Sequence, residues 1–70
     1  MKKVTGRVYI VNKARTRAFE EVEKAVYHPF SHILEIYRHN PFGVFCHQIV
    51  VCEYGDDIKC TGIKIKVGDH

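Results

Sequence analysis

Residues 12–28 read NKARTRAFEEVEKAVYH, and their apolar side chains recur at spacings of three and four. That periodicity places these side chains on one stripe of an amphipathic α-helix. Pro29 follows directly and prevents the helix from continuing. The sequence therefore predicts one helix that begins at Asn12 or Thr16 and ends near His28. Its apolar stripe consists of Ala14, Ala18, Phe19, Val22, Ala25 and Val26.

The segments on both sides of this helix alternate apolar and polar residues, which is typical of β-strands. They are residues 3–12, 31–39, 44–54 and 58–67. Short turns separate the last three segments, so we expect those three to form an antiparallel meander. The sequence predicts a single small domain, residues 1–70, of the α+β class. Its element order is β-α-β-β-β, with one helix packed on a mainly antiparallel four-stranded sheet.

Size and cysteine content limit the class of protein. Seventy residues make one domain, and no run approaches the roughly 20 apolar residues that span a bilayer. The three cysteines, Cys46, Cys52 and Cys60, are an odd number, whereas a small secreted domain usually carries an even set that forms disulfides. We therefore expect free thiols, a cytoplasmic location and no membrane partner.

The segment 44–54 is apolar on both of its faces. One face carries Val44, Cys46, Val50 and Cys52, and the other carries Phe45, Ile49 and Val51. A strand that is covered on both sides shows this pattern, but a single helix covers only one side of a sheet. We therefore predict that the face with Phe45, Ile49 and Val51 is covered by a larger protein partner or by a second copy of the chain.

Positive charge is concentrated near the N-terminus, where residues 1–17 hold six bases and no acid. Several of these bases surround the predicted start of the helix, where free backbone N–H groups attract anions. The alternative is a solvated basic face that the glutamates of residues 20–23 neutralise. The predicted anion or nucleic-acid patch consists of Lys2, Lys3, Arg7, Tyr9, Lys13, Arg15 and Arg17.

No segment carries a specific catalytic, cofactor or metal motif. The string YGDD at residues 54–57 resembles the metal motif of RNA-dependent RNA polymerases, but Gly-Asp-Asp is also a common hairpin turn. Cys46 and Cys52 lie about 20 Å apart at ~3.3 Å per strand residue, too far to share one zinc ion. His47 follows Cys46 directly, so the two side chains point to opposite faces. We predict a protein that is not an enzyme, with no cofactor and no metal site.

Three functions remain open on this basis. The first, which the doubly apolar segment favours, is a small accessory protein that binds and modulates a larger protein, most simply by inhibition. Such compact regulators are often encoded by phages or mobile elements. The second is a nucleic-acid-binding protein that uses the basic N-terminal strand and helix start, and binds with a steep salt dependence. The third is a homodimeric structural component whose two copies cover each other's bare sheet faces.

Overall fold

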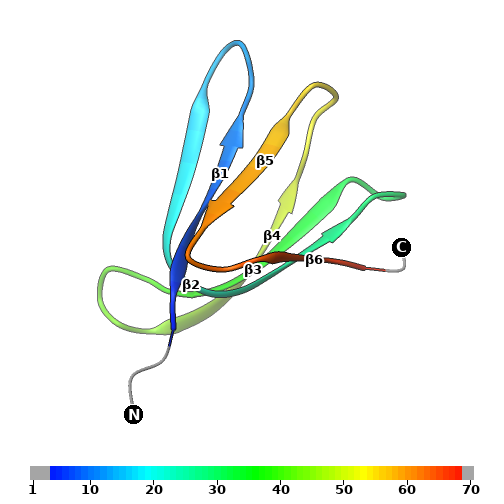
Figure 1. Cartoon of the computed structure of the whole chain (residues 1–70). Coiled ribbons are helices and arrows are strands. Elements are labelled where there is room, and N and C mark those ends of the chain that lie inside the picture. The colour runs from blue at the N-terminus through cyan, green and yellow to red at the C-terminus, as the bar shows by residue number, and fades with distance from the viewer. Residues whose placement is uncertain (1–3, 69–70) are drawn as a thin grey trace.

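The computed structural model describes residues 4–68, and these residues form an all-β fold that contains no helix (Figure 1). The predicted α+β class is therefore wrong, and so is the four-stranded sheet. The segment predicted to be a helix is the longest strand. The six strands are β1 (Gly6–Val11), β2 (Thr16–His28), β3 (Ile33–His39), β4 (Phe45–Val51), β5 (Asp57–Thr61) and β6 (Ile65–Val67).

Two β-bulges in β2 explain why it resembles a helix in the sequence. Between Phe19 and Val22, β2 advances by three residues while the paired part of β1 advances by two. Glu21, which lies in this bulge, has a positive φ of 55°. Between Val22 and Lys24, β2 advances by two residues while the paired part of β3 advances by one. Each bulge adds one residue to β2. The buried residues Phe19, Val22 and Ala25 consequently recur at every third position, which imitates helical periodicity.

β2 lies at the centre of the sheet because each of its halves has different neighbours. Its first half pairs antiparallel with β1, while its second half pairs antiparallel with β3 and parallel with β6. The order along the sheet is β4-β3-β2-β1-β5, with β6 beside β2. β5 pairs with β1 rather than with β4. The predicted meander is thus correct for β3 and β4 and wrong for the last segment.

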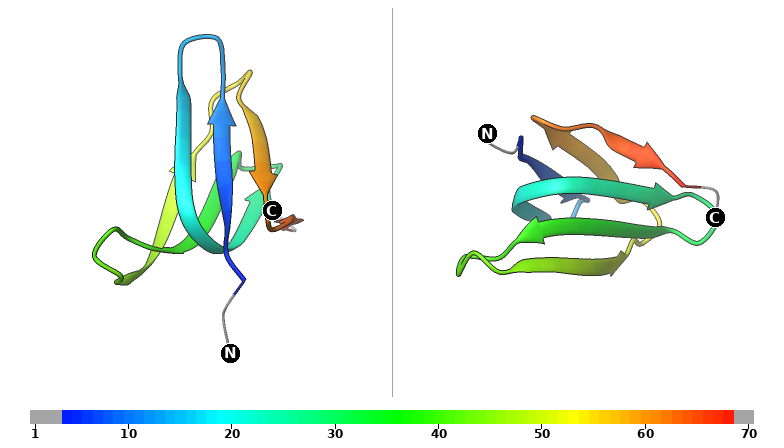
Figure 2. Two further views of the ribbon diagram at one scale, coloured as in Figure 1. Left: turned by 60° about the vertical axis from the view of Figure 1, so that its left-hand side comes forward. Right: turned by 90° about the horizontal axis from the view of Figure 1, so that it is seen from below.

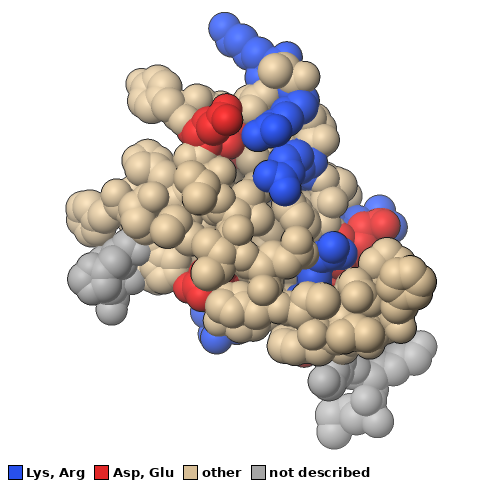
Figure 3. Space-filling view, turned by 180° about the vertical axis from the view of Figure 1, so that it is seen from behind, with Lys and Arg blue, Asp and Glu red and all other residues tan. Residues whose placement is uncertain are grey.

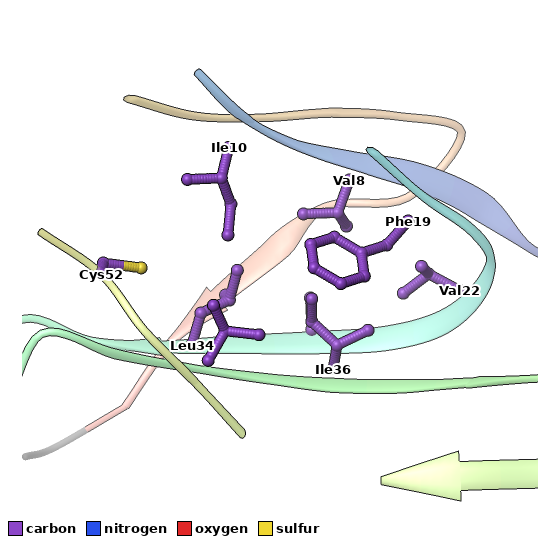
Figure 4. Packing of buried hydrophobic residues seen from close by; sticks show 9 residues of the cluster. Val8, Ile10, Phe19, Val22, Leu34, Ile36 and Cys52 are labelled. Atoms are coloured by element: carbon purple, nitrogen blue, oxygen red, sulfur yellow. The ribbon is translucent and has the colours of Figure 1, made fainter. Parts of the chain in front are cut away.

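The sheet bends along β2 and folds over itself (Figures 1 and 2). Strands of the same sheet therefore cover the inner face that the predicted helix was expected to cover. β1, β5 and the first half of β2 form one layer, and the remaining strands form the other. Val8 of β1 and Leu34 and Ile36 of β3 point towards one another between the layers (Figure 4). The side chains of all three are fully buried, as is that of Val22. The core therefore lies between the two halves of one sheet.

Nothing helical in the described part of the chain is long and apolar enough to cross a membrane.

Candidate interaction surface

The first strand of the sheet path, β4, exposes a row of large apolar side chains. Phe45, Ile49 and Val51 keep 51, 63 and 69% of their surface accessible, whereas Val50 and Cys52 of the opposite face are buried. These are the two faces that the alternation of residues 44–54 separates. The structure thus places the three predicted contact residues together on one exposed face, and their role in binding stays a prediction.

Pairing between β3 and β4 extends this row into a broader surface, which we call the outer face. Residues that pair directly across neighbouring strands lie on the same side of a sheet. The register places Tyr37 between Lys24 and His47, and Glu35 between Val26 and Ile49. The outer face consists of Lys24, Val26, His28, Ile33, Glu35, Tyr37, His39, Phe45, His47, Ile49 and Val51.

One carboxylate organises the middle of the outer face. Oε2 of Glu35 lies 2.5 Å from Nε2 of His28, and its Oε1 lies 2.9 Å from Nε2 of His47. The Tyr37 hydroxyl donates to the same Oε1 at 3.3 Å. The Tyr37 and His47 rings stack 4.2 Å apart and only 4° from parallel. We call these four side chains the Glu35 cluster; they come from three adjacent strands.

The cluster favours a fixed negative charge rather than a group ready to exchange protons. The hydrogen bond to His28, together with those to His47 and Tyr37, lowers the pKa of Glu35. Burial, with the nearby Glu35 charge, raises the pKa of Tyr37. A carboxylate held by three partners at low pKa is a poor general base. Among residues 4–68, no three His, Cys, Asp or Glu side chains are grouped to hold a metal ion.

The Glu35 cluster should make the free energy of unfolding depend on pH. Because the folded-state pKa of Glu35 lies below its unfolded value, its ionised form stabilises the fold above the unfolded pKa. That contribution is lost as the pH falls through the lowered folded-state pKa. The Glu35→Gln variant should therefore be less stable at neutral pH, and its free energy of unfolding should decline less steeply on acidification. Urea titrations from pH 7 to pH 3 measure both effects.

The matched control for this prediction is Asp57→Asn, which neutralises an exposed carboxylate at the start of β5. This variant measures how much of the change in Glu35→Gln comes from removing any one carboxylate. Identical slopes for Glu35→Gln and the unaltered protein would show that the cluster does not hold Glu35 ionised.

The predicted basic patch is divided between two faces. Lys2 and Lys3 lie outside the described residues. Arg7 lies on the exposed side of β1, with its Nε 3.3 Å from Oε1 of Glu20, and a hydrogen bond with Tyr9 raises the pKa of Arg7. The predicted anion site depended on the free backbone N–H groups at a helix N-terminus. No helix begins within residues 4–68, so this reason for an anion site no longer applies.

The remaining predicted bases follow the β1–β2 turn and the opposite side of β2. Lys13 and Arg15 lie in the turn, and the Arg17 guanidinium stacks 5.3 Å over the ring of Phe19. On the face turned away from the viewer of Figure 1, Lys and Arg side chains form a short row at one end, and much of the rest is uncharged (Figure 3). The structure therefore does not gather the predicted patch into one surface.

The Gly-Asp-Asp string is used as a turn. Asp56 accepts hydrogen bonds from Nδ2 of Asn12 at 2.6 Å and from the backbone N–H of Glu53 at 2.8 Å. The bond from Asn12 lowers the pKa of Asp56. Asp56 thereby ties the loop between β4 and β5 to the end of β1, which is a structural role.

Sequence reasoning located the apolar half of the outer face and missed its polar half. Glu35, Tyr37 and His39 alternate along the predicted strand 31–39, which was a sign of a shared face. Their partners His28 and His47 could be identified only once the strand pairing was known. Comparisons with protein-family models, curated proteins and solved structures found no match for this chain. The outer face is therefore the feature of the chain that bears on function.

Proposed function

We propose that this chain is a non-enzymatic accessory protein of the cytoplasm that binds a larger protein and inhibits it. The observation that supports this proposal is the exposed apolar row of Phe45, Ile49 and Val51 on a terminal strand. Large apolar side chains gathered on one exposed face mark interaction sites more often than scattered ones do.

The chemistry of the outer face suits a protein partner. An effective interface combines an apolar centre with a polar rim. Here the apolar row of β4 adjoins Tyr37 and His47, and the Tyr37 hydroxyl and Nε2 of His47 already have a partner in Glu35. Because each large apolar side chain of the row is only 51–69% exposed, its burial would contribute about 1–2 kcal/mol before the costs of association. A partner can therefore cover this surface without leaving the cluster's hydrogen bonds unmade.

In this proposal the chain inhibits its partner by steric occlusion. A domain of 70 residues that presents one apolar face can block a functional surface of a larger protein simply by occupying it. Because the interaction is mainly apolar, the complex should persist at high salt, whereas a complex held by surface charges weakens as salt screens them.

Native mass spectrometry of the tagged protein, captured from its own cell lysate at moderate salt, tests the proposal. We expect a stoichiometric heteromeric mass with the unaltered protein. The Ile49→Asp variant should lose that mass, because it places a charge in the centre of the apolar row. Ile49 is 63% exposed, but it pairs directly with Glu35, and like charges that face each other across strands are destabilising. The variant should therefore melt somewhat below the unaltered protein while remaining folded at the temperature of the capture.

The matched control is Lys59→Asp, a charge change on the exposed face of β5. This variant should retain the partner. Capture of the unaltered chain without a partner, or equal retention by Ile49→Asp and Lys59→Asp, would contradict the proposed role of the outer face.

A further inference from the structure

The two edge strands of the sheet path, β4 and β5, differ in how they are protected against pairing with a further strand. β5 carries two charged residues, Asp57 and Lys59. β4 carries no Asp, Glu, Lys, Arg or Pro, and its seven residues pair with β3 in unbroken register. Charges, proline and bulges are the features by which edge strands avoid adding another strand. β4 has none of these features, and no strand lies beyond it in the described part of the chain (Figure 2).

The hydrogen bonds at the two ends of β4 show which backbone groups point away from β3. The N–H of Cys52 donates to the carbonyl of His32, and the N–H of Asn40 donates to the carbonyl of Val44. In an antiparallel pair, successive residues direct their groups alternately towards and away from the neighbour. The even-numbered residues 44–52 therefore face β3. The free edge is formed by the N–H and C=O groups of Phe45, His47, Ile49 and Val51.

We propose that β4 pairs antiparallel with β4 of a second copy of this chain, on a two-fold axis through Gln48. Only residues whose groups point to the free edge can exchange hydrogen bonds. With Gln48 on the axis, Phe45 lies opposite Val51 of the second copy, and His47 lies opposite Ile49. Each of the four edge residues then uses both of its groups. Shifting the axis to His47 or Ile49 leaves an end residue of β4 unmatched.

The side chains are compatible with this register on both faces. On the outer face, each facing pair joins a ring to a β-branched side chain, a favourable cross-strand combination. On the other face the two Gln48 side chains meet at the axis. Oε1 of each Gln48 accepts a hydrogen bond from Nε of Arg38 at 2.5 Å, which leaves its amide NH₂ free to donate across the axis. Because β4 is uncharged, self-pairing opposes no like charges within the strand.

The pairing closes on itself and enlarges the outer face. An isologous contact through a single edge gives a dimer and not a fibre. Within the dimer the two rows of Phe45, Ile49 and Val51 lie side by side on one continuous sheet surface. This inference goes beyond the proposed function and does not depend on it, because the dimer forms from purified chain alone.

Disulfide trapping tests the register. At a non-hydrogen-bonded pair, facing Cα atoms lie about 4.5 Å apart, within the range that a disulfide spans. Gln48→Cys should therefore form a covalent dimer on mild oxidation at least about tenfold faster than Ile49→Cys. In the proposed register the two Ile49 positions are diagonal and exceed the roughly 7 Å limit for a disulfide. Random collision would give the reverse preference, because Ile49 is exposed and Gln48 is half-buried.

The unaltered protein provides the baseline, because both variants retain Cys46, Cys52 and Cys60. Light scattering of the unaltered chain over a range of concentrations adds a readout that needs no substitution, and we expect a reversible dimer. A monomer at all concentrations would overturn the inference, including the case in which β4 accepts a strand from a different protein. Cross-linking that is no faster at position 48 than at position 49 would overturn the register.

Discussion

Replacing Gly6 by alanine is expected to remove much of the stability of the fold. A Cβ atom at this position would lie 2.2 Å from the carbonyl oxygen of Thr61 and 2.9 Å from the backbone nitrogen of Ile63. Both are backbone atoms, so no side chain can rotate away to make room. We expect a loss of about 3 kcal/mol or more, from a total of roughly 3.5–10 kcal/mol for a domain of this length. Urea and thermal unfolding measure the loss.

Gly43→Ala is the matched control for Gly6→Ala. Gly43 has a φ of 83°, but a Cβ there would meet no atom within 4 Å. Only the left-handed backbone conformation penalises the substitution, by about 1–2 kcal/mol. If Gly6→Ala melted at or above the temperature of Gly43→Ala, the close approach of β1 to the segment after β5 would be wrong.

The sequence contained more information about single strands than about their arrangement. Alternation correctly predicts strands within residues 3–12, 31–39 and 44–54, which contain β1, β3 and β4. It also predicts residues 58–67 as one strand, with a β-bulge at Gly62 where the inward-facing parity changes. In the structure that segment breaks at Gly62, whose φ is 81°, into β5 and β6, which pair with different neighbours. A glycine marks such a break in the sequence, but the neighbours of each part depend on the whole sheet.

The incorrect helix has a specific physical cause. A regular strand buries every second residue, but the two bulges of β2 turn that spacing into every third residue at Phe19, Val22 and Ala25. Hydrophobic periodicity alone cannot distinguish such a strand from a helix. The charges argue against a helix in this segment. Lys13, Arg15 and Arg17 lie where the positive end of a helix dipole would disfavour bases.

The candidate site shows the same division between local and long-range information. Which residues of β4 share a face follows from alternation, so Phe45, Ile49 and Val51 were predictable as a group. The Glu35 cluster joins β2, β3 and β4, so it depends on two registers, one of which follows a bulge. A segment interpreted as a helix could not reveal that His28 approaches Glu35 from a neighbouring strand.

Leu34→Ala is expected to destabilise the protein severely, whereas Ile49→Ala should leave its stability nearly unchanged. Leu34 is fully buried between the two layers of the sheet, and truncating such a side chain costs about 2–5 kcal/mol in lost apolar burial and cavity formation. Ile49 projects from the outer face and is 63% exposed, so its truncation should change the free energy of unfolding by less than about 0.5 kcal/mol. Denaturant unfolding of both variants measures the difference.

The contrast between Leu34 and Ile49 separates the two roles that the adjacent strands β3 and β4 combine. If the inner face supplies the stability and the outer face supplies the binding surface, Ile49→Ala should weaken partner capture while it melts normally. Leu34→Ala should lose binding only in proportion to its unfolded fraction. Comparable destabilisation by the two substitutions would mean that the outer face is already covered within a single chain. In that case the apolar row of β4 would need no partner to explain it.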